Sequence, residues 1–150
     1  MPDPLPSPDN PLTGHCRCGR TTIAITAPPI MTAACHCRGC QRMSASAFSL
    51  TAMVAPTAFR VTAGSPVRGG AKTPQLDHQF CPDCMTWMFT RIVGVDLFLN
   101  VRSTMFDDPR WSMPFIETVT AEKLPWATTP ARHSYPGYPP PEEFGSLLAG

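Results

Sequence analysis

The seven cysteines of this 150-residue chain fall into three short clusters. In chain order the clusters are Cys16-x-Cys18, Cys35-x-Cys37-x-x-Cys40 and Cys81-x-x-Cys84. An odd number of thiols cannot all be used in disulfide bonds, and spacings of one or two residues hold sulfur atoms close enough to share one soft cation. Zinc is the usual ion at such clusters. The chain is therefore predicted to fold around bound zinc.

The number of thiols also suggests how they divide between two ions. A structural zinc takes four protein ligands, whereas a catalytic zinc takes three and leaves a fourth position for water or substrate. The favoured division gives a four-cysteine cluster of Cys16, Cys18, Cys81 and Cys84 and a three-cysteine cluster of Cys35, Cys37 and Cys40. The spacing alone also permits a four-thiolate site that borrows from the middle cluster and leaves one thiol shared or idle.

Composition limits the classes of partner. The formal net charge is +1, charged residues make up 15% of the chain, and no run of Lys or Arg occurs. Nucleic acids and anionic membranes require concentrated positive charge, so neither is expected as the main partner. No apolar run approaches the length of a membrane span. At 150 residues the chain is expected to form one domain.

The two ends of the chain are predicted to be tails. Residues 1–13 are rich in proline and are expected to be disordered, and they lack the apolar core of a signal peptide. We therefore expect a cytoplasmic protein whose reduced thiols bind metal. The zinc domain is predicted to span residues 14–141, followed by a C-terminal tail at 142–150.

The pattern of apolar residues favours an all-β domain of about eight short strands. Nineteen prolines argue for many turns and against long helices. Alternation predicts strands at 21–26, 30–34, 48–54, 59–62, 76–80, 87–91, 95–101 and 115–120. One or two helical turns are expected at 41–46, a loop at 64–74, and an extended, proline-rich segment from residue 125 onward.

The cysteine clusters and their neighbours carry a resemblance to a known family. The matching segments are Gly14-x-Cys16-x-Cys18-Gly19, Ala34-Cys35-His36-Cys37-x-x-Cys40, Phe80-Cys81-x-x-Cys84, Val95-Asp96 to Asp108-Pro109, Leu124-Pro125-Trp126 and Tyr135-Pro136-Gly137-Tyr138-Pro139-Pro140. Together they resemble the glutathione-dependent formaldehyde-activating enzyme family, the Gfa-like proteins.

The resemblance implies a fold, a metal content and an activity. The fold would be of the β-tent type with two zinc ions, the four-cysteine cluster being structural and the three-cysteine cluster catalytic. The implied activity is that of S-(hydroxymethyl)glutathione synthase, a carbon–sulfur lyase that joins glutathione and formaldehyde. The implied partners are therefore a small thiol such as glutathione and a small aldehyde. The sequence leaves the identity of both substrates, the direction of the reaction and assembly into a homo-oligomer open.

Several positions depart from the family pattern, Met85, Gln41, Ala47 and Arg102 among them. Met85 follows the last cysteine pair where the family usually has glycine, so Met85 either adopts a left-handed conformation at a cost of about 1 kcal/mol or the turn is reshaped. Gln41 stands where relatives more often carry a basic residue, and Arg102 stands where a glycine is expected. The details that face the substrate are therefore expected to differ from those of relatives.

A zinc ion with an open coordination position suits thiol chemistry. Bound zinc lowers the pKa of a thiol, and the resulting thiolate could add to the carbonyl carbon of an aldehyde. Cys35, Cys37 and Cys40 are the predicted catalytic ligands, and His36 is a candidate proton relay. The alternative, favoured because both flanking cysteines point inward, is that the His36 side chain points away from the metal.

Two other classes of function remain open on the sequence. The chain could be a non-catalytic binding module stabilised by zinc, or a protein that responds to zinc or oxidants by releasing metal from the three-cysteine cluster. A fourth protein ligand at that cluster would favour the binding module. Its absence would favour the enzyme.

Overall fold

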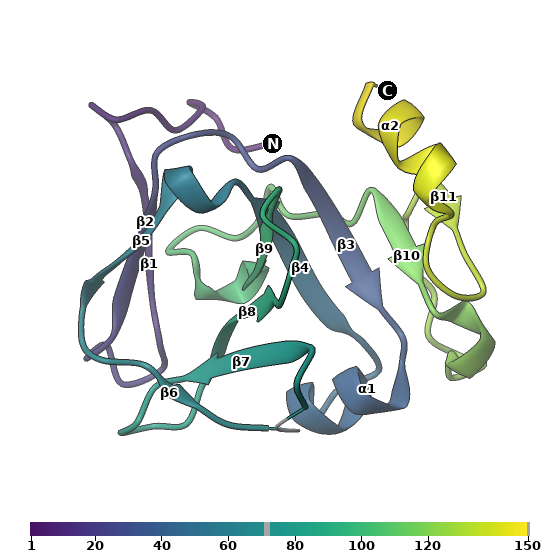
Figure 1. Cartoon of the computed structure of the whole chain (residues 1–150), viewed down its shortest axis with the longest axis horizontal. Coiled ribbons are helices and arrows are strands. Elements are labelled where there is room, and N and C mark those ends of the chain that lie inside the picture. The colour runs from purple at the N-terminus through teal and green to yellow at the C-terminus, as the bar shows by residue number, and fades with distance from the viewer. Residues whose placement is uncertain (71–72, 150) are drawn as a thin grey trace.

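The computed structural model describes residues 1–70 and 73–149, which form short strands around two cores (Figure 1). The strands of this described part are β1 (Leu12–His15), β2 (Thr22–Ile25), β3 (Met31–Cys35), β4 (Ser49–Val54), β5 (Phe59–Ala63), β6 (Val67–Arg68), β7 (Leu76–Phe80), β8 (Trp87–Ile92), β9 (Leu99–Arg102), β10 (Ile116–Thr118) and β11 (His133–Ser134). Its α-helices are α1 (Arg38–Ser44) and α2 (Pro141–Ala149). Its 3₁₀ turns are η1 (Pro56–Ala58), η2 (Ser103–Met105) and η3 (Thr120–Glu122). Neither α-helix is long and apolar enough to cross a membrane.

The strands form two sheets. One has the order β1-β2-β5, and the other has the order β11-β10-β3-β4-β9-β8-β7-β6. Pairing is antiparallel except where β10 lies parallel to both β3 and β11. The predicted all-β class is confirmed, and the arrangement of two sheets of short strands around the cysteine clusters agrees with the β-tent type.

The main core lies between the small sheet and the middle of the large one. Ile23 and Ile25 of β2 pack in one cluster with Val54 of β4 and with Leu99 and Val101 of β9. These apolar side chains occupy alternate positions in their strands, as expected for strands with one face toward a core. The other positions of β4 and β9 lie on the opposite face of the large sheet.

That opposite face carries polar residues next to the three-cysteine cluster. The antiparallel register pairs Cys35 of β3 with Ser49 of β4, and Thr51 of β4 with Arg102 of β9. Ser49 and Thr51 are two residues apart, so they share one face with their partners. We call this row, formed by Cys35, Ser49, Thr51 and Arg102, the polar row.

The strand predicted at 95–101 is shorter than expected. Only Leu99–Arg102 pairs as β9, while the residues before it belong to the turn after β8. Gly94 has φ +85°, and the Val95 amide donates to the Ile92 carbonyl at 3.0 Å. The turn therefore takes up the first half of a segment whose apolar alternation resembles a strand. In the loop predicted at 64–74, β6 pairs with β7, and residues 71–72 lie outside the described part.

Elements of the structure extend past both predicted domain boundaries. β1 begins at Leu12, and backbone hydrogen bonds of 3.1 Å join Ser7 and Asn10 in both directions. At the other end, helix α2 places Leu147 in a second core cluster with Ile116 of β10. The division into a domain at 14–141 and two tails stays a prediction. The two terminal segments nonetheless contact the strands.

We predict that Gly14→Ala destabilises the domain. Gly14 lies in β1 opposite Phe106, and a Cβ atom at this position would meet the Met105 carbonyl oxygen and approach the Phe106 Cα atom to 2.9 Å. Because backbone atoms cannot move aside cheaply, the free energy of unfolding should fall by about 1–3 kcal/mol. Gly137→Ala is the matched control, since nothing lies within 4 Å of its Cβ position. Urea denaturation of both variants measures the difference, and equal stabilities would contradict the prediction.

Candidate metal centres

Two backbone turns of the same kind present the thiols of the four-cysteine cluster. In the first turn, the Cys16 amide donates to the Thr21 carbonyl and the Gly19 amide donates to the Cys16 carbonyl, both at 3.0 Å. The second turn repeats the first of these bonds, from the Cys81 amide to the Thr86 carbonyl at 3.1 Å. The two segments are far apart in sequence, yet they fold into matching loops that hold their thiols toward one another.

Met85 occupies the left-handed position of the second turn. Its φ angle is +59°, and its amide donates to the Cys81 carbonyl at 2.9 Å. Gly19 has φ +80° at the corresponding position of the first turn. Of the two outcomes expected at Met85, the structure therefore has the left-handed conformation with the turn preserved. The methionine side chain is exposed, so only the backbone strain opposes it.

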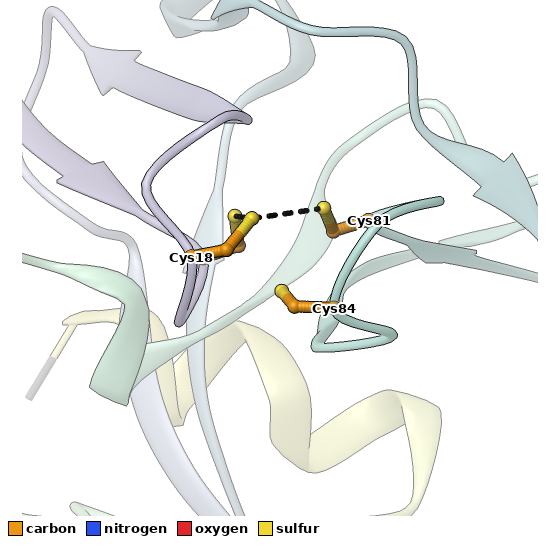
Figure 2. Close-up of side chains that lie close together, drawn as sticks. Cys18, Cys81 and Cys84 are labelled. Atoms are coloured by element: carbon orange, nitrogen blue, oxygen red, sulfur yellow. Dashed lines mark hydrogen bonds between the residues drawn. The ribbon is translucent and has the colours of Figure 1, made fainter.

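The four sulfur atoms of this cluster lie within 4.8 Å of one another. Cys16 and Cys81 are buried and Cys18 is exposed. Figure 2 shows Cys18 reaching from its loop toward Cys81 and Cys84, with a sulfur–sulfur separation of 3.8 Å between Cys18 and Cys81. A hydrogen bond with the Thr86 hydroxyl lowers the pKa of Cys84 to about 5. Four thiols at such separations fit a tetrahedral zinc ion closed by protein ligands.

The three-cysteine cluster is built where β3 leads into α1. Cys35 ends the strand, and Cys37 is the N-cap residue of the helix, where its sulfur accepts a hydrogen bond from the Cys40 amide at 3.2 Å. Cys40 lies in the first turn of the helix, and Ser44 bonds back to its carbonyl at 2.6 Å. The three sulfur atoms lie within 4.8 Å of one another. A short loop and the first turn of α1 therefore bring together three thiols from the six residues 35–40.

Within the three-cysteine cluster, the Cys35 thiol is the one that most readily becomes a thiolate. A hydrogen bond from the Cys40 thiol, helped by Thr118, lowers the pKa of Cys35 to about 5. Sharing that hydrogen bond with Cys35, together with burial, raises the pKa of Cys40. A cation that displaces the protons of these thiols gains thiolate ligands.

The described residues contribute three metal ligands to this cluster and no fourth from His, Cys, Asp or Glu. The donor set therefore fits a zinc ion with one open position. Tyr138 lies near this cluster, and the residue is 71% exposed. Burial and then the charges of the three cysteines raise the pKa of its phenol, which stays protonated at neutral pH.

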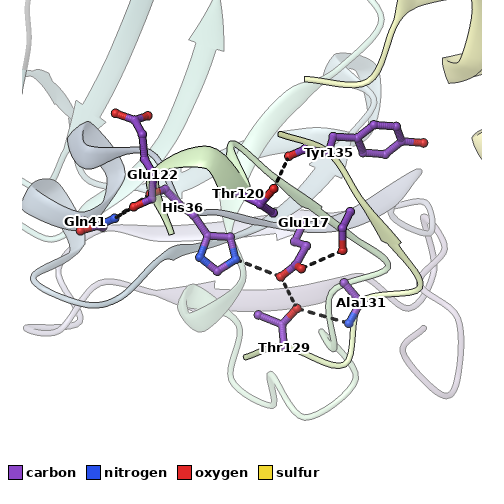
Figure 3. A network of polar contacts seen from close by, with 9 residues as sticks. His36, Gln41, Glu117, Thr120, Glu122, Thr129, Ala131 and Tyr135 are labelled. Carbon is purple, nitrogen blue, oxygen red and sulfur yellow. Dashed lines mark hydrogen bonds and ion pairs between the residues drawn. The ribbon is translucent and has the colours of Figure 1, made fainter. Parts of the chain in front are cut away.

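His36 lies in a buried hydrogen-bond network that includes no thiol (Figure 3). Its Nε2 atom is 2.9 Å from the Glu117 carboxylate, which also accepts hydrogen bonds from Thr129 and Ser134, both at 2.7 Å. Burial alone would raise the pKa of Glu117. The hydrogen bonds from Thr129, Ser134 and His36 outweigh it and lower that pKa to about 2.

The geometry gives His36 a positioning role. Its ring points toward Glu117 on β10, and its amide donates to the Thr118 carbonyl at 3.0 Å. Gln41 of α1 donates to the His36 carbonyl at 2.7 Å and to the Glu122 carbonyl at 3.0 Å. These bonds fix the loop that carries Cys35 and Cys37. The predicted relay role of His36 stays a prediction, and the network gives it no contact with the thiols.

The structure also places residues that the cluster pattern does not single out. Glu117 anchors His36, and Arg102 lies on the same face of the large sheet as Cys35, with β4 between them. His78 is buried, and its Nδ1 atom is 2.8 Å from the Thr90 hydroxyl. His15 is exposed and lies 3.5 Å from Asp107.

Comparison with known proteins supports the resemblance seen in the residues. The family model of the glutathione-dependent formaldehyde-activating enzyme matches residues 11–122. The chain belongs to this family. The matched segment contains both cysteine clusters, Arg102 and Glu117.

The other comparisons add a likeness of fold. A search of curated proteins finds no match. Among solved structures, the crystal structure of a Rhodobacter sphaeroides protein matches with a TM-score of 0.51 and 19% identity. The match covers 66% of this chain and 93% of that chain. At this identity the likeness shows a shared fold.

We predict that the two clusters respond differently to the loss of one thiol. Cys81→Ser should leave the chain unfolded, because a structural zinc contributes on the order of 10 kcal/mol to folding and Cys81 joins two distant segments. Cys37→Ser should give a folded protein that binds one metal equivalent fewer. Circular dichroism and metal analysis of both variants test this. Two equally unfolded chains would contradict the division into a structural and an open site.

We predict that Glu117→Gln weakens the fold in a pH-dependent way. Leaving His36 and two hydroxyl groups without their carboxylate should lower the free energy of unfolding at pH 7 by about 2 kcal/mol. Because the pKa of Glu117 is lowered in the folded state, this stabilisation is complete above the unfolded-state pKa of about 4.3 and is lost as the pH falls toward 2.

The measurement is denaturant unfolding of wild type and variant from pH 7 to pH 3.5. The stability difference should shrink below about pH 4.3, and the pH dependence of the shared cysteines cancels in that difference. Glu122→Gln is the matched control, because the structure uses the Glu122 carbonyl and its side chain is exposed. A difference that stays constant with pH would contradict the assignment.

Proposed function

We propose that this protein is a zinc-dependent carbon–sulfur lyase that adds a small aldehyde-derived group to a thiol such as glutathione, or removes it. One observation carries the proposal. In a chain of the glutathione-dependent formaldehyde-activating enzyme family, the three-cysteine cluster receives no fourth ligand from the described residues. A ligand-deficient thiolate site is what a zinc that exchanges substrate requires.

The proposal assigns one zinc ion to each cluster. The four-cysteine cluster would enclose a structural ion, while Cys35, Cys37 and Cys40 would hold a second ion with one exchangeable position. When bound there, zinc supplies the charge that keeps a substrate thiol ionised at neutral pH. All seven cysteines are free of disulfides, which suits a reducing compartment such as the cytoplasm.

The chain's own residues can position the reactants and move one proton. The hydrogen bond between His36 and Glu117 of β10 holds the loop that carries Cys35 and Cys37 in place. The substrate thiol first loses its proton to water. As the resulting thiolate adds to the carbonyl carbon of an aldehyde, the C=O π bond breaks and its oxygen gains negative charge. Tyr138 is protonated at neutral pH and lies near Cys35, so its phenol can donate a proton to that oxygen and then regain one from water. In the reverse direction the phenol first loses its proton to water, the phenolate takes the proton of the hydroxyl group, and the C–S bond breaks.

We predict that the zinc-loaded protein accelerates the exchange between glutathione plus formaldehyde and their hemithioacetal. The spontaneous reaction sets the baseline, so the measurement is the exchange rate by ¹³C NMR with labelled formaldehyde. Wild type should raise that rate in proportion to its concentration, while Cys37→Ser should give only the baseline because it lacks one of the three ligands. An equal concentration of free zinc is the control.

The competing functions give different results in the same samples. If wild type and Cys37→Ser both leave the exchange at its baseline with glutathione and with other small thiols, the lyase proposal is wrong. Release of one zinc equivalent by mild oxidant, with a disulfide among the three cysteines, would then favour a redox-responsive protein. Retention of both metals without exchange would favour a binding module.

A further inference from the structure

Arg102 is a buried cation without an acidic partner. Its side chain lies on β9, the residue is 7% exposed, and its guanidinium carbon lies 4.0 Å from the centre of the Trp87 ring. Among the residues that the structure describes, Arg102 forms no ion pair with a carboxylate, and its Nε atom has no hydrogen-bond partner. Stacking on an aromatic ring offsets only part of the cost of removing a guanidinium from water.

The strand register directs this cation toward the three-cysteine cluster. Arg102 pairs with Thr51, and two residues along β4, Ser49 pairs with Cys35 at the end of β3. All four side chains of this polar row lie on the same face of the sheet. Arg102 therefore lies on the face of the sheet that carries Cys35, with β4 between them. Thiolates of the three-cysteine cluster would offer this buried cation a counter-charge.

Neighbouring side chains hold the guanidinium in place. Trp87 donates from its indole nitrogen to the Thr90 hydroxyl at 3.0 Å, and His78 lies 2.8 Å from the same hydroxyl. These contacts fix the ring on which Arg102 stacks. Burial, and then the charge of Arg102, lower the pKa of His78 and favour its neutral form. Arg102 is consequently a fixed, buried positive charge on this face of the sheet.

The charge balance suggests a role for Arg102 in ligand choice. Three thiolates around one divalent ion carry a net charge of −1, and a fourth anionic ligand would raise this to −2 in a partly buried site. The Arg102 guanidinium offsets one of these charges. It therefore lowers the free energy of binding an anionic ligand far more than that of binding a neutral one. Its effect on ligand choice should therefore depend on the charge of the ligand.

We propose that Arg102 makes the open position of the three-cysteine cluster selective for an anionic ligand, such as a thiolate, over a neutral one. This specificity rests on the metal site of the proposed function, and it requires only ligand exchange, in which the anion replaces water and no electrons are transferred. Arg102 stands where the family pattern led us to expect glycine. Selectivity for an anion would thus be a property of this chain's own sequence.

Cobalt-substituted protein provides the test without any turnover. Co²⁺ takes the same tetrahedral thiolate sites, and its absorption bands respond to the fourth ligand. Azide is the anionic probe and imidazole the neutral one, both titrated at pH 7.5. The closed four-cysteine cluster should not respond, so difference spectra report the open position.

Arg102→Met should weaken azide binding by about tenfold or more and change imidazole binding by less than about twofold. Arg102→Lys should retain most of the azide affinity. Arg91→Met is the matched control, because Arg91 also stacks on aromatic rings, at 5.6 Å from Phe89, but is exposed and belongs to β8. This control should bind both probes as wild type does.

Three results with the variants, and one with wild type, would overturn the proposal. The first is an equal loss of affinity for both probes, and the second is unchanged azide binding in Arg102→Met. The third is loss of the second metal from Arg102→Met and Arg102→Lys alike, which would assign Arg102 a structural role only. Azide binding that behaves as proposed in a protein without exchange activity would leave the anion site standing while the lyase assignment fails. Wild type that binds a single cobalt equivalent would overturn both.

Discussion

The structure depends on bringing four sulfur atoms from two distant turns close enough together to bind one zinc ion. The turns after β1 and β7 repeat the same backbone hydrogen bond, and their thiols meet within 4.8 Å. The small sheet and the large sheet are thereby tied at one end, while the apolar residues between them form the core. Pairs of short strands are only weakly stable by themselves. A zinc ion bound at this link would therefore add folding stability that the strands of this 150-residue chain do not provide alone.

The second cluster is supported differently, and this difference indicates its use. Cys35, Cys37 and Cys40 come from one strand end and one helical turn, so they join no distant segments. The loop that carries them is supported by the bond between His36 and Glu117, and the buried cation Arg102 lies on the same face of the sheet as Cys35. The side toward Tyr138 is exposed. A site whose cysteine loop is held by buried contacts and whose other side is exposed to solvent is suited to exchange a ligand.

The sequence predicted the features that depend on short-range spacing. The all-β class and the grouping of the sulfur atoms into four and three follow from alternation and from cysteine intervals. The support of the sites was not predictable in this way, because Glu117 lies 81 residues from His36 and no local pattern links them. Helix α2 was missed since a proline-rich segment precedes it, and its Leu147 is stabilised by contacts with distant strands. The contacts of Arg102 likewise depend on the register between β4 and β9.

The central claim is that two metal ions are bound, one enclosed by four sulfur atoms and the other by three. X-ray absorption spectroscopy at the zinc edge, on protein whose metal content is known from native mass spectrometry, counts these sulfur atoms directly. The account predicts two zinc ions per chain with seven sulfur ligands between them, an average of about 3.5 per ion, and one lighter oxygen or nitrogen atom that does not come from the chain. A single zinc ion, or two ions that share a bridging cysteine and are each saturated by the protein, would contradict it.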